Sequence, residues 1–304
     1  MLRWRLPLGI LLVAALLVLC WLDLDGAPAG IWLFPLTAIV TVLATQETLR
    51  MTALAQLHPL RWPVYLGNLL IVCGTWLVFA ASLGLNWLLP GTIDPQRFIE
   101  RCLPGTPICC LAIAVVLIFV LEMRRYQKPG DNLANIAASI FPLVYVGAML
   151  SFAVNLRITW GTGALASWII VVKMGDTGAY IVGRLIGRHK LVPMLSPGKT
   201  VEGAIGDLLF CCLGSWIAFN WLIPLTVPET VAAGPWWGWI VFGILVGIAG
   251  MVGDLAESLL KRDVGRKDSS DWLPGLGGVL DIVDSLLLAA PVAWLCWASG
   301  LVGR

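Results

Sequence analysis

The amino-acid sequence predicts an all-α, polytopic integral membrane protein, because three of its features depart together from those of soluble proteins. The chain has 304 residues, of which 59% are hydrophobic and only 12% are charged, whereas soluble domains are about 45–50% apolar and about 25% charged. Its mean hydropathy is +0.88. Its 16 tryptophans suit a protein at membrane–water interfaces, where indole rings concentrate. These features exclude a soluble enzyme, a disordered chain and a secreted disulfide scaffold, and the net charge of +2 does not indicate a nucleic-acid partner.

Apolar segments of membrane-spanning length run along the whole chain. A helix needs about 20 apolar residues to cross the hydrocarbon core, and we identify about nine such segments. They are residues 6–22, 27–45, 63–87, 105–121, 133–154, 162–182, 202–222, 236–260 and 279–299. The first has an alternative interpretation as a signal peptide, because Arg3 and Arg5 precede it and Ala27-Pro28-Ala29 resembles a cleavage site. An uncleaved first helix is simpler, since the next apolar segment follows at once.

The distribution of basic residues predicts an orientation. With the N-terminus in the cytoplasm and nine alternating helices, 15 of the 20 Lys and Arg residues fall on the inside and four on the outside, while Lys173 lies within a helix. This bias follows the positive-inside rule and favours a cytoplasmic N-terminus. We divide the chain into N-terminal transmembrane helices (1–130) and a C-terminal catalytic transmembrane region (131–304), because most unusual residues lie in the second part.

Ionisable residues in or beside the predicted helices indicate where function lies, because charge inside a membrane is costly. Those that stand out are Lys173, Asp176, Glu202, Asp207, Asp254, Glu257, Asp281 and Asp284. Asp207 is equally well explained as an ordinary hydrogen-bonding group between helices. The others cluster at the predicted cytoplasmic ends of their helices.

Two carboxylate pairs have helical spacing. Asp254 and Glu257 are three residues apart, as are Asp281 and Asp284, so each pair shares a helix face. Adjacent carboxylates repel each other unless a cation lies between them, and without nearby His or Cys a hard cation such as magnesium is favoured. The alternative is a solvated carboxylate face at a helix end, which the apolar neighbours of Asp281 disfavour.

Basic and glycine-rich segments lie beside these acids. The run 261–268 contains four cations, and the turn 274–278 that follows it is rich in glycine, which permits close backbone approach to a ligand. Acids for a metal, cations for phosphate and a flexible turn together indicate phosphoryl or nucleotidyl transfer. The positive-inside rule alone is the alternative explanation of the cations.

A second polar segment, residues 196–203, contains Gly198-Lys199-Thr200, which resembles the end of a P-loop. We reject a P-loop because Pro193 stands where that motif needs glycine and we expect no preceding β-strand. A helix beginning near Thr200 would still direct its amide dipole at an anion beside Lys199.

At these residues the sequence resembles the phosphatidate cytidylyltransferases, also called CDP-diacylglycerol synthases. The similar motifs are Ser258-Leu259-Leu260-Lys261-Arg262, Lys267-Asp268, Pro274, Gly277-Gly278 and Asp281-x-x-Asp284, with Asp176-Thr177-Gly178-Ala179-Tyr180, Gly183-Arg184, Gly187 and Ser196-Pro197-x-Lys199-Thr200-x-Glu202-Gly203 upstream. Two positions depart from the signature. Leu276 replaces a histidine and Ile282 replaces an arginine.

The resemblance implies that CTP and phosphatidate react to give CDP-diacylglycerol and pyrophosphate with Mg²⁺ or Mn²⁺, and it leaves a second cation open. It implies Asp254 and Asp281 as metal ligands, with Asp284 and Asp268 in support. The implied catalytic residues are Lys261, Arg262, Lys267, Asp268 and Asp284. The implied substrate-binding residues are Lys199, Ser196, Thr200, Ser258, Gly277, Gly278, Asp176 and Glu202. We expect Asp176 and Glu202 to hold the lysines in place.

The expected surroundings are a lipid bilayer, in particular a bacterial inner (plasma) membrane, with the active site facing the cytoplasm. We expect no nucleic-acid partner, and a homodimer stays open. Three other functions also stay open. One is a CTP-dependent kinase or cytidylyltransferase acting on another lipid, another is an ion-coupled transporter, and the last is an inactive relative that serves as a scaffold.

Overall fold

The computed structural model describes residues 11, 14–23, 30–88, 105–227, 234–270, 272 and 277–303. Packing divides the chain into two compact units. The first unit comprises Met1–Ile158 and Asp268–Leu280, and the second comprises Thr159–Lys267 and Asp281–Arg304. The functional division that we predict at residue 130 is a different kind of boundary and stays a prediction.

Helices of membrane-spanning length and apolarity dominate the described residues. Seven such segments are present, at Arg61–Ala81, Thr106–Arg125, Asn132–Trp160, Thr162–Ile186, Val201–Thr226, Gly238–Asp263 and Leu280–Ala298. They coincide with the last seven predicted segments and confirm an all-α, polytopic membrane protein. A short apolar helix, Ala14–Asp23, lies before them. The total of nine helices and the cytoplasmic N-terminus stay predictions.

Helix α2 differs from the segment predicted at residues 27–45, since it spans Leu33–Leu54. It continues through a polar stretch because the threonine hydroxyls are satisfied within the helix. The hydroxyls of Thr45 and Thr48 donate to the carbonyls of Thr41 and Ala44 at 2.6 and 2.8 Å. The hydropathy pattern predicted that the segment ends at residue 45. The helix instead continues through these buried polar residues to Leu54. Residues 27–29 lie outside the described part of the chain.

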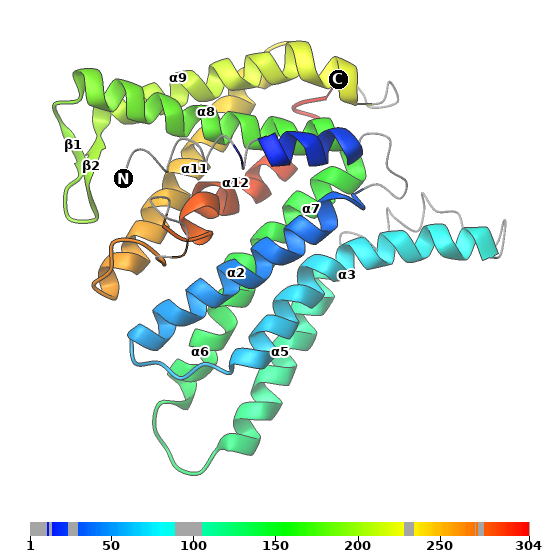
Figure 1. Ribbon diagram of the computed structural model, residues 1–304, viewed down its shortest axis with the longest axis vertical. Helices are drawn as coiled ribbons and strands as arrows, with labels where there is room; N and C mark the ends of the chain where they lie inside the picture. Colours follow the sequence, from blue (N-terminus) through cyan, green and yellow to red (C-terminus); the bar gives the residue numbers. More distant parts are fainter. Residues whose placement is uncertain are drawn as a thin grey trace. The chain divides into compact units, whose positions relative to one another are not determined.

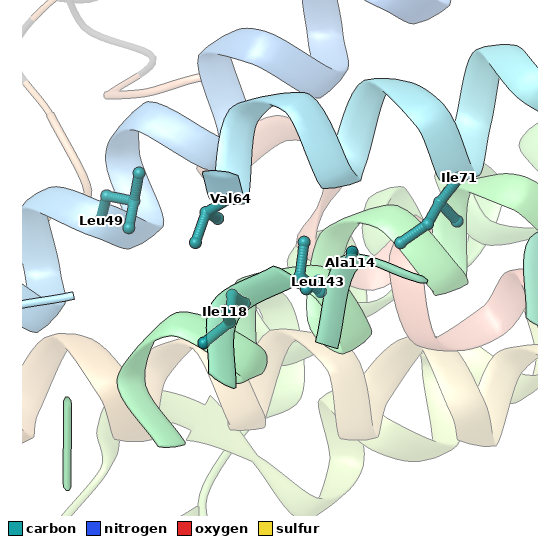
Figure 2. Packing of buried hydrophobic residues seen from close by; sticks show 6 residues of the cluster. All are labelled: Leu49, Val64, Ile71, Ala114, Ile118 and Leu143. Atoms are coloured by element: carbon teal, nitrogen blue, oxygen red, sulfur yellow. The ribbon is translucent and has the colours of Figure 1, made fainter. Parts of the chain in front are cut away.

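The first unit is a helical bundle with an apolar core (Figures 1 and 2). After α2 come α3 (Arg61–Leu88), α5 (Thr106–Arg125), α6 (Asn132–Pro142), the π-helical segment η1 (Leu143–Ala148) and α7 (Met149–Trp160). Helix α3 packs against α2 and α5. The core cluster drawn in Figure 2 consists of Leu49, Val64, Ile71, Ala114, Ile118 and Leu143. Burial of these side chains holds α2, α3, α5 and η1 together.

The second unit contains a pair of closely packed helices joined by a β-hairpin. Its elements are α8 (Thr162–Ile186), β1 (Lys190–Val192), β2 (Ser196–Thr200), α9 (Val201–Ile217), the π-helical η2 (Ala218–Leu222), α10 (Ile223–Thr226), α11 (Gly238–Asp263) and α12 (Leu280–Ala298), the last joining the unit at Asp281. Helices α8 and α9 lie side by side (Figure 1). A Cβ at Gly178 would clash with Phe210, and one at Gly206 would clash with Val182. Glycine thus permits the close helix approach typical of membrane bundles.

The β-hairpin corrects one sequence-based expectation. Residues 190–192 and 196–200 pair as antiparallel strands, so the expectation that no strand precedes the helix at Thr200 was wrong. The hairpin is closed by the Glu202 carboxylate, which accepts hydrogen bonds from the backbone N–H groups of Arg188 and His189 at 3.1 and 3.2 Å. Rejection of a P-loop still holds, because Lys199 lies within a strand and not in a loop between a strand and a helix.

Candidate functional site

One pocket of the second unit is lined by eight charged side chains. Its volume is about 530 Å³, within the range of small-molecule sites. Residues of α8, the β-hairpin, α9, α11 and α12 line it. The charged lining residues are the aspartates Asp176, Asp207, Asp254, Asp281 and Asp284 and the cations Arg184, Lys199 and Lys261.

Helical spacing explains why these side chains reach the same pocket. Asp176, Tyr180 and Arg184 follow one another at intervals of four along α8 and line the pocket together. Asp254 and Lys261 are about two turns apart on α11 and both face it. Asp281 and Asp284 open α12, so the carboxylates lie in its first turns.

Two lysines occupy the centre of the charge network. The Lys261 ammonium contacts the Glu257 carboxylate at 2.5 Å and the Asp281 carboxylate at 2.6 Å. The Lys199 ammonium contacts the Asp254 carboxylate at 2.7 Å. Lysines thus pair with Asp254, Glu257 and Asp281 in this structure, and the metal ion expected beside these carboxylates stays a prediction.

Lys173 connects two helices of the second unit, a role that the sequence did not indicate. Its ammonium donates to the Asp176 carboxylate and to the Ile282 carbonyl, both at 2.9 Å, and to the Ser285 hydroxyl at 3.3 Å. It thus joins α8 to the first turns of α12. Only the three-dimensional packing reveals this role, because Lys173 and its α12 partners are more than 100 residues apart in sequence.

The expectation that Asp176 and Glu202 hold the lysines implied to bind phosphate was wrong. Asp176 pairs with Lys173 instead. Glu202 pairs with the His189 imidazole at 2.6 Å and caps the hairpin. Glu202 can reach these partners because it lies in the first turn of α9, shortly after the end of β2.

The structure brings about half of the predicted site residues to the pocket: Asp176, Lys199, Thr200, Asp254, Lys261, Asp281 and Asp284 line it. The Thr200 hydroxyl also caps α9 by accepting from the Gly203 N–H at 3.0 Å, as the predicted helix start requires. Five others, Ser196, Glu202, Ser258, Arg262 and Lys267, belong to the second unit but are not among the pocket's lining residues. Asp268, Gly277 and Gly278 belong to the first unit. Pro274 and Leu276 lie outside the described residues.

Arg262 binds the hairpin by donating from Nε to the Leu195 carbonyl at 3.1 Å. The lining residues that were not assigned to the site from the sequence include Tyr180 and Arg184. The Arg184 guanidinium donates to the Tyr180 hydroxyl at 2.5 Å, and its carbon lies 5.8 Å from the centre of the Tyr180 ring. The interval of four between Asp176, Tyr180 and Arg184 was the signal that could have identified them.

The donor set of the pocket fits a hard divalent cation that arrives with phosphate groups. Among the described residues, no three His, Cys, Asp or Glu side chains are grouped closely enough to hold a metal ion by themselves. Magnesium is commonly held by one or two carboxylates while substrate phosphates and water complete its shell. Asp254 and Asp281 can supply such carboxylates if their lysine partners turn toward an anionic ligand.

Comparison with known proteins gives the family of this chain. The family model of the cytidylyltransferase family matches residues 4–299. A phosphatidate cytidylyltransferase of Mycobacterium bovis is 36% identical over 174 residues, which are 55% of this chain and 52% of that protein. The phosphatidate cytidylyltransferase of Staphylococcus aureus (strain COL) is 33% identical over 212 residues, 67% of this chain and 77% of that protein.

The uncharacterized protein YnbB of Escherichia coli K12 is 40% identical over 223 residues, 71% of this chain and 68% of that protein. The alignment spans about half the length of the mycobacterial relative, whereas the family model covers nearly the whole of this chain. This chain is therefore a member of the cytidylyltransferase family.

Proposed function

We propose that this protein transfers the CMP group of CTP to phosphatidate, which gives CDP-diacylglycerol and pyrophosphate. The observation that carries the proposal is the pocket in which Lys199, Lys261 and three aspartates of α11 and α12 meet. These residues belong to the motifs that resemble the phosphatidate cytidylyltransferases. The printed names of the Mycobacterium and Staphylococcus relatives support the same acceptor lipid.

The reaction needs alignment and charge neutralisation more than it needs proton transfer. A phosphate oxygen of phosphatidate attacks the α-phosphorus of CTP, and the new P–O bond forms as the bond to the β-phosphate oxygen breaks. A phosphate monoester has a second pKa of about 6, so the nucleophile is already anionic near neutral pH. The protein therefore contributes chiefly by holding two anions in line and offsetting their repulsion.

Lys199 and Lys261 are suited to contact the phosphates. Each ammonium is already charged and lies at the pocket, where it is paired with a carboxylate. It can therefore exchange this partner for a phosphate group. Lys261 is also held by Glu257, whose side chain is fully buried, which keeps the ammonium near the pocket. Arg184 is a third cation at the pocket and suits a bidentate contact to phosphate.

A divalent cation would complete the charge balance. The pocket offers five aspartates against three cationic side chains, while both proposed substrates are anionic. Asp254 and Asp281 would hold Mg²⁺ or Mn²⁺, with Asp284 in support. When bound, the cation would neutralise the triphosphate of CTP. Whether a second cation binds, and whether the protein forms a homodimer, stay predictions.

The charge asymmetry of the sequence supports a pocket that faces the cytoplasm, and the bacterial relatives support a bacterial plasma membrane. CTP would then arrive from water, and phosphatidate would enter from the surrounding lipid. Helices α8, α9, α11 and α12, which line the pocket, all have membrane-spanning length and composition. This placement gives the lipid substrate access to the same site as the nucleotide.

The direct test is an assay of the purified protein in detergent with phosphatidate, magnesium and CTP labelled on either the α- or the γ-phosphate. We expect the α-label in the lipid and one pyrophosphate released for each CDP-diacylglycerol formed. Lipid labelled by γ-phosphate would contradict the proposal and favour a CTP-dependent kinase. Transfer to other lipids but not to phosphatidate would contradict the proposed acceptor.

A further inference from the structure

A buried carboxylate of the first unit binds residues on both sides of the connection that leads into α12. Glu47 of α2 is only 4% exposed. Its Oε1 accepts hydrogen bonds from the Ser270 hydroxyl at 2.8 Å and the Val279 N–H at 3.0 Å. Its Oε2 accepts from the Ser269 hydroxyl at 2.9 Å and the Leu280 N–H at 2.7 Å. Both carboxylate oxygens are thus engaged twice.

These contacts provide hydrogen-bond acceptors for the backbone N–H groups at the beginning of α12. The first N–H groups of a helix have no partner within the helix, and a negative charge is stabilising at that end. Glu47 supplies acceptor and charge to Val279 and Leu280, where α12 begins. The hydroxyls of Ser269 and Ser270, at the start of the segment that leads into α12, donate to the same carboxylate. The Glu47 side chain therefore binds both ends of this segment.

The contact also explains why position 278 is glycine. A Cβ added to Gly278 would overlap the Ser269 hydroxyl and the Glu47 carboxylate. The second glycine of the Gly277-Gly278 pair therefore leaves room for the Glu47 contact. This is a structural reason for a residue that the sequence had indicated only as a substrate-binding position.

We propose that Glu47 is a positioning residue for Asp281, an inference whose catalytic part rests on the proposed function. Leu280 and Asp281 are consecutive residues of α12, so fixing the N–H groups of Val279 and Leu280 fixes the backbone from which Asp281 projects. Asp281 in turn contacts Lys261 at 2.6 Å. Glu47 acts on the reaction through this helix turn and does not touch the substrate.

The test compares Glu47→Gln with Gln46→Ala, an exposed neighbour on the same helix turn. The glutamine keeps the size of the side chain but turns one acceptor into an NH₂ donor. In either orientation, this NH₂ faces the N–H of Val279 or Leu280. Hydrogen exchange of the full-length protein in lipid nanodiscs should then accelerate at least tenfold at residues 277–285 and stay unchanged in α5.

The kinetic signature separates positioning from stability. We expect Glu47→Gln to lower kcat at least tenfold while the KM values for CTP and phosphatidate change less than threefold, because Lys199 and Arg184 do not depend on this helix turn. Gln46→Ala should match the wild type in exchange and kinetics. Ser270→Ala removes one of the four donors and keeps the charge, so a smaller change of the same kind is expected. If Glu47→Gln does not fold, Ser270→Ala decides by the same two measurements.

Three results would overturn the proposal. The first is exchange and kcat within twofold of the wild type in Glu47→Gln. The second is faster exchange throughout the protein with a matching loss of kcat, which would make Glu47 only a stabilising residue. The third is faster hydrogen exchange at residues 277–285 in Glu47→Gln without any change in kcat. If the wild type itself makes no CDP-diacylglycerol, the proposed function fails, and the exchange measurement alone then supports or overturns the fixing of α12 by Glu47.

Discussion

Carboxylates in the two units have different kinds of partner. In the first unit, Glu47 accepts from two backbone N–H groups and two hydroxyls, and Asp23 contacts the Arg157 guanidinium at 2.5 Å and accepts from the Trp32 N–H. In the second unit, Asp254 and Asp281 contact lysine ammonium groups at a pocket. Charge alone therefore does not distinguish a carboxylate that holds the fold from one that is proposed to bind a metal ion.

The partners of Glu47 differ in kind from those of Asp254 and Asp281. A carboxylate bound by backbone N–H groups can change partners only if the local fold opens, and leaving those donors unpaired costs about 1–3 kcal/mol each. A carboxylate bound by a lysine can exchange this partner for a cation while the lysine turns to an anion. The predictions that follow use this contrast, and in each the two units are expected to respond differently.

Removal of divalent cations should have the largest effect and should concern the second unit only. We expect excess chelator to reduce transfer to background, and magnesium or manganese to restore it, because the pocket lacks the positive charge to hold two anionic substrates. Calcium should restore it poorly, since it prefers longer and looser coordination than magnesium. Product formation with each cation provides the measurement. Full activity in excess chelator would exclude a metal role for Asp254 and Asp281.

Replacement of a single pocket carboxylate should come next. Asp281→Asn should lower kcat at least hundredfold, about 2.7 kcal/mol of barrier, because the charge that faces Lys261 and the proposed metal is lost. The protein should still insert and purify, since Lys261 keeps its contact to Glu257. The matched control is Asp263→Asn, an exposed residue at the end of α11. Activity of Asp281→Asn near that of the control would remove Asp281 from the site.

The sequence predicted those features of the two units that depend on local pattern, namely the helices and the faces on which their charged residues lie. Apolar length identified the seven spans, and the spacing of Asp254 with Glu257 and of Asp281 with Asp284 placed each pair on one helix face, although Glu257 is buried and is not among the pocket's lining residues. The pairings of Lys199 with Asp254 and of Lys261 with Asp281 were not predictable, because periodicity gives a face but not the helix opposite it. Glu47 was missed because it follows the predicted end of its segment, and its partners are 222–233 residues away.

A change beside Glu47 should also lower the stability of the protein. Gly278→Ala places a Cβ against Ser269 and Glu47, and overpacking of this kind typically costs about 1–3 kcal/mol. We expect a lower unfolding temperature in detergent. The matched control is Gly130→Ala, where no atom lies within 4 Å of the added Cβ. Equal unfolding temperatures for the two variants would show that the Glu47 contact is loose.

The smallest effect is expected where the sequence departs from the family signature. Ile282 lies between two pocket aspartates, but position 282 is about 100° around the helix from position 281. Asp281 and Asp284 line the pocket, whereas Ile282 is not among its lining residues. Instead, the Ile282 carbonyl accepts from Lys173 at 2.9 Å, a contact that any side chain at this position permits. An arginine at 282 is therefore not needed as a phosphate ligand in this chain.

Leu276 replaces the histidine of the signature and lies outside the described residues, so the argument there rests on the chemistry. In the proposed reaction the phosphatidate nucleophile is already ionised, so no proton acceptor is needed at position 276. We expect the wild type to be active and Leu276→His to change kcat by less than tenfold, about 1.4 kcal/mol, with or without Ile282→Arg. The measurement is the initial rate of CDP-diacylglycerol formation by the wild type, both single variants and the double variant. A silent wild type that gains turnover only in the double variant would instead make this chain an inactive relative, and the lysine-paired aspartates of the second unit would then be structural, like the carboxylates of the first.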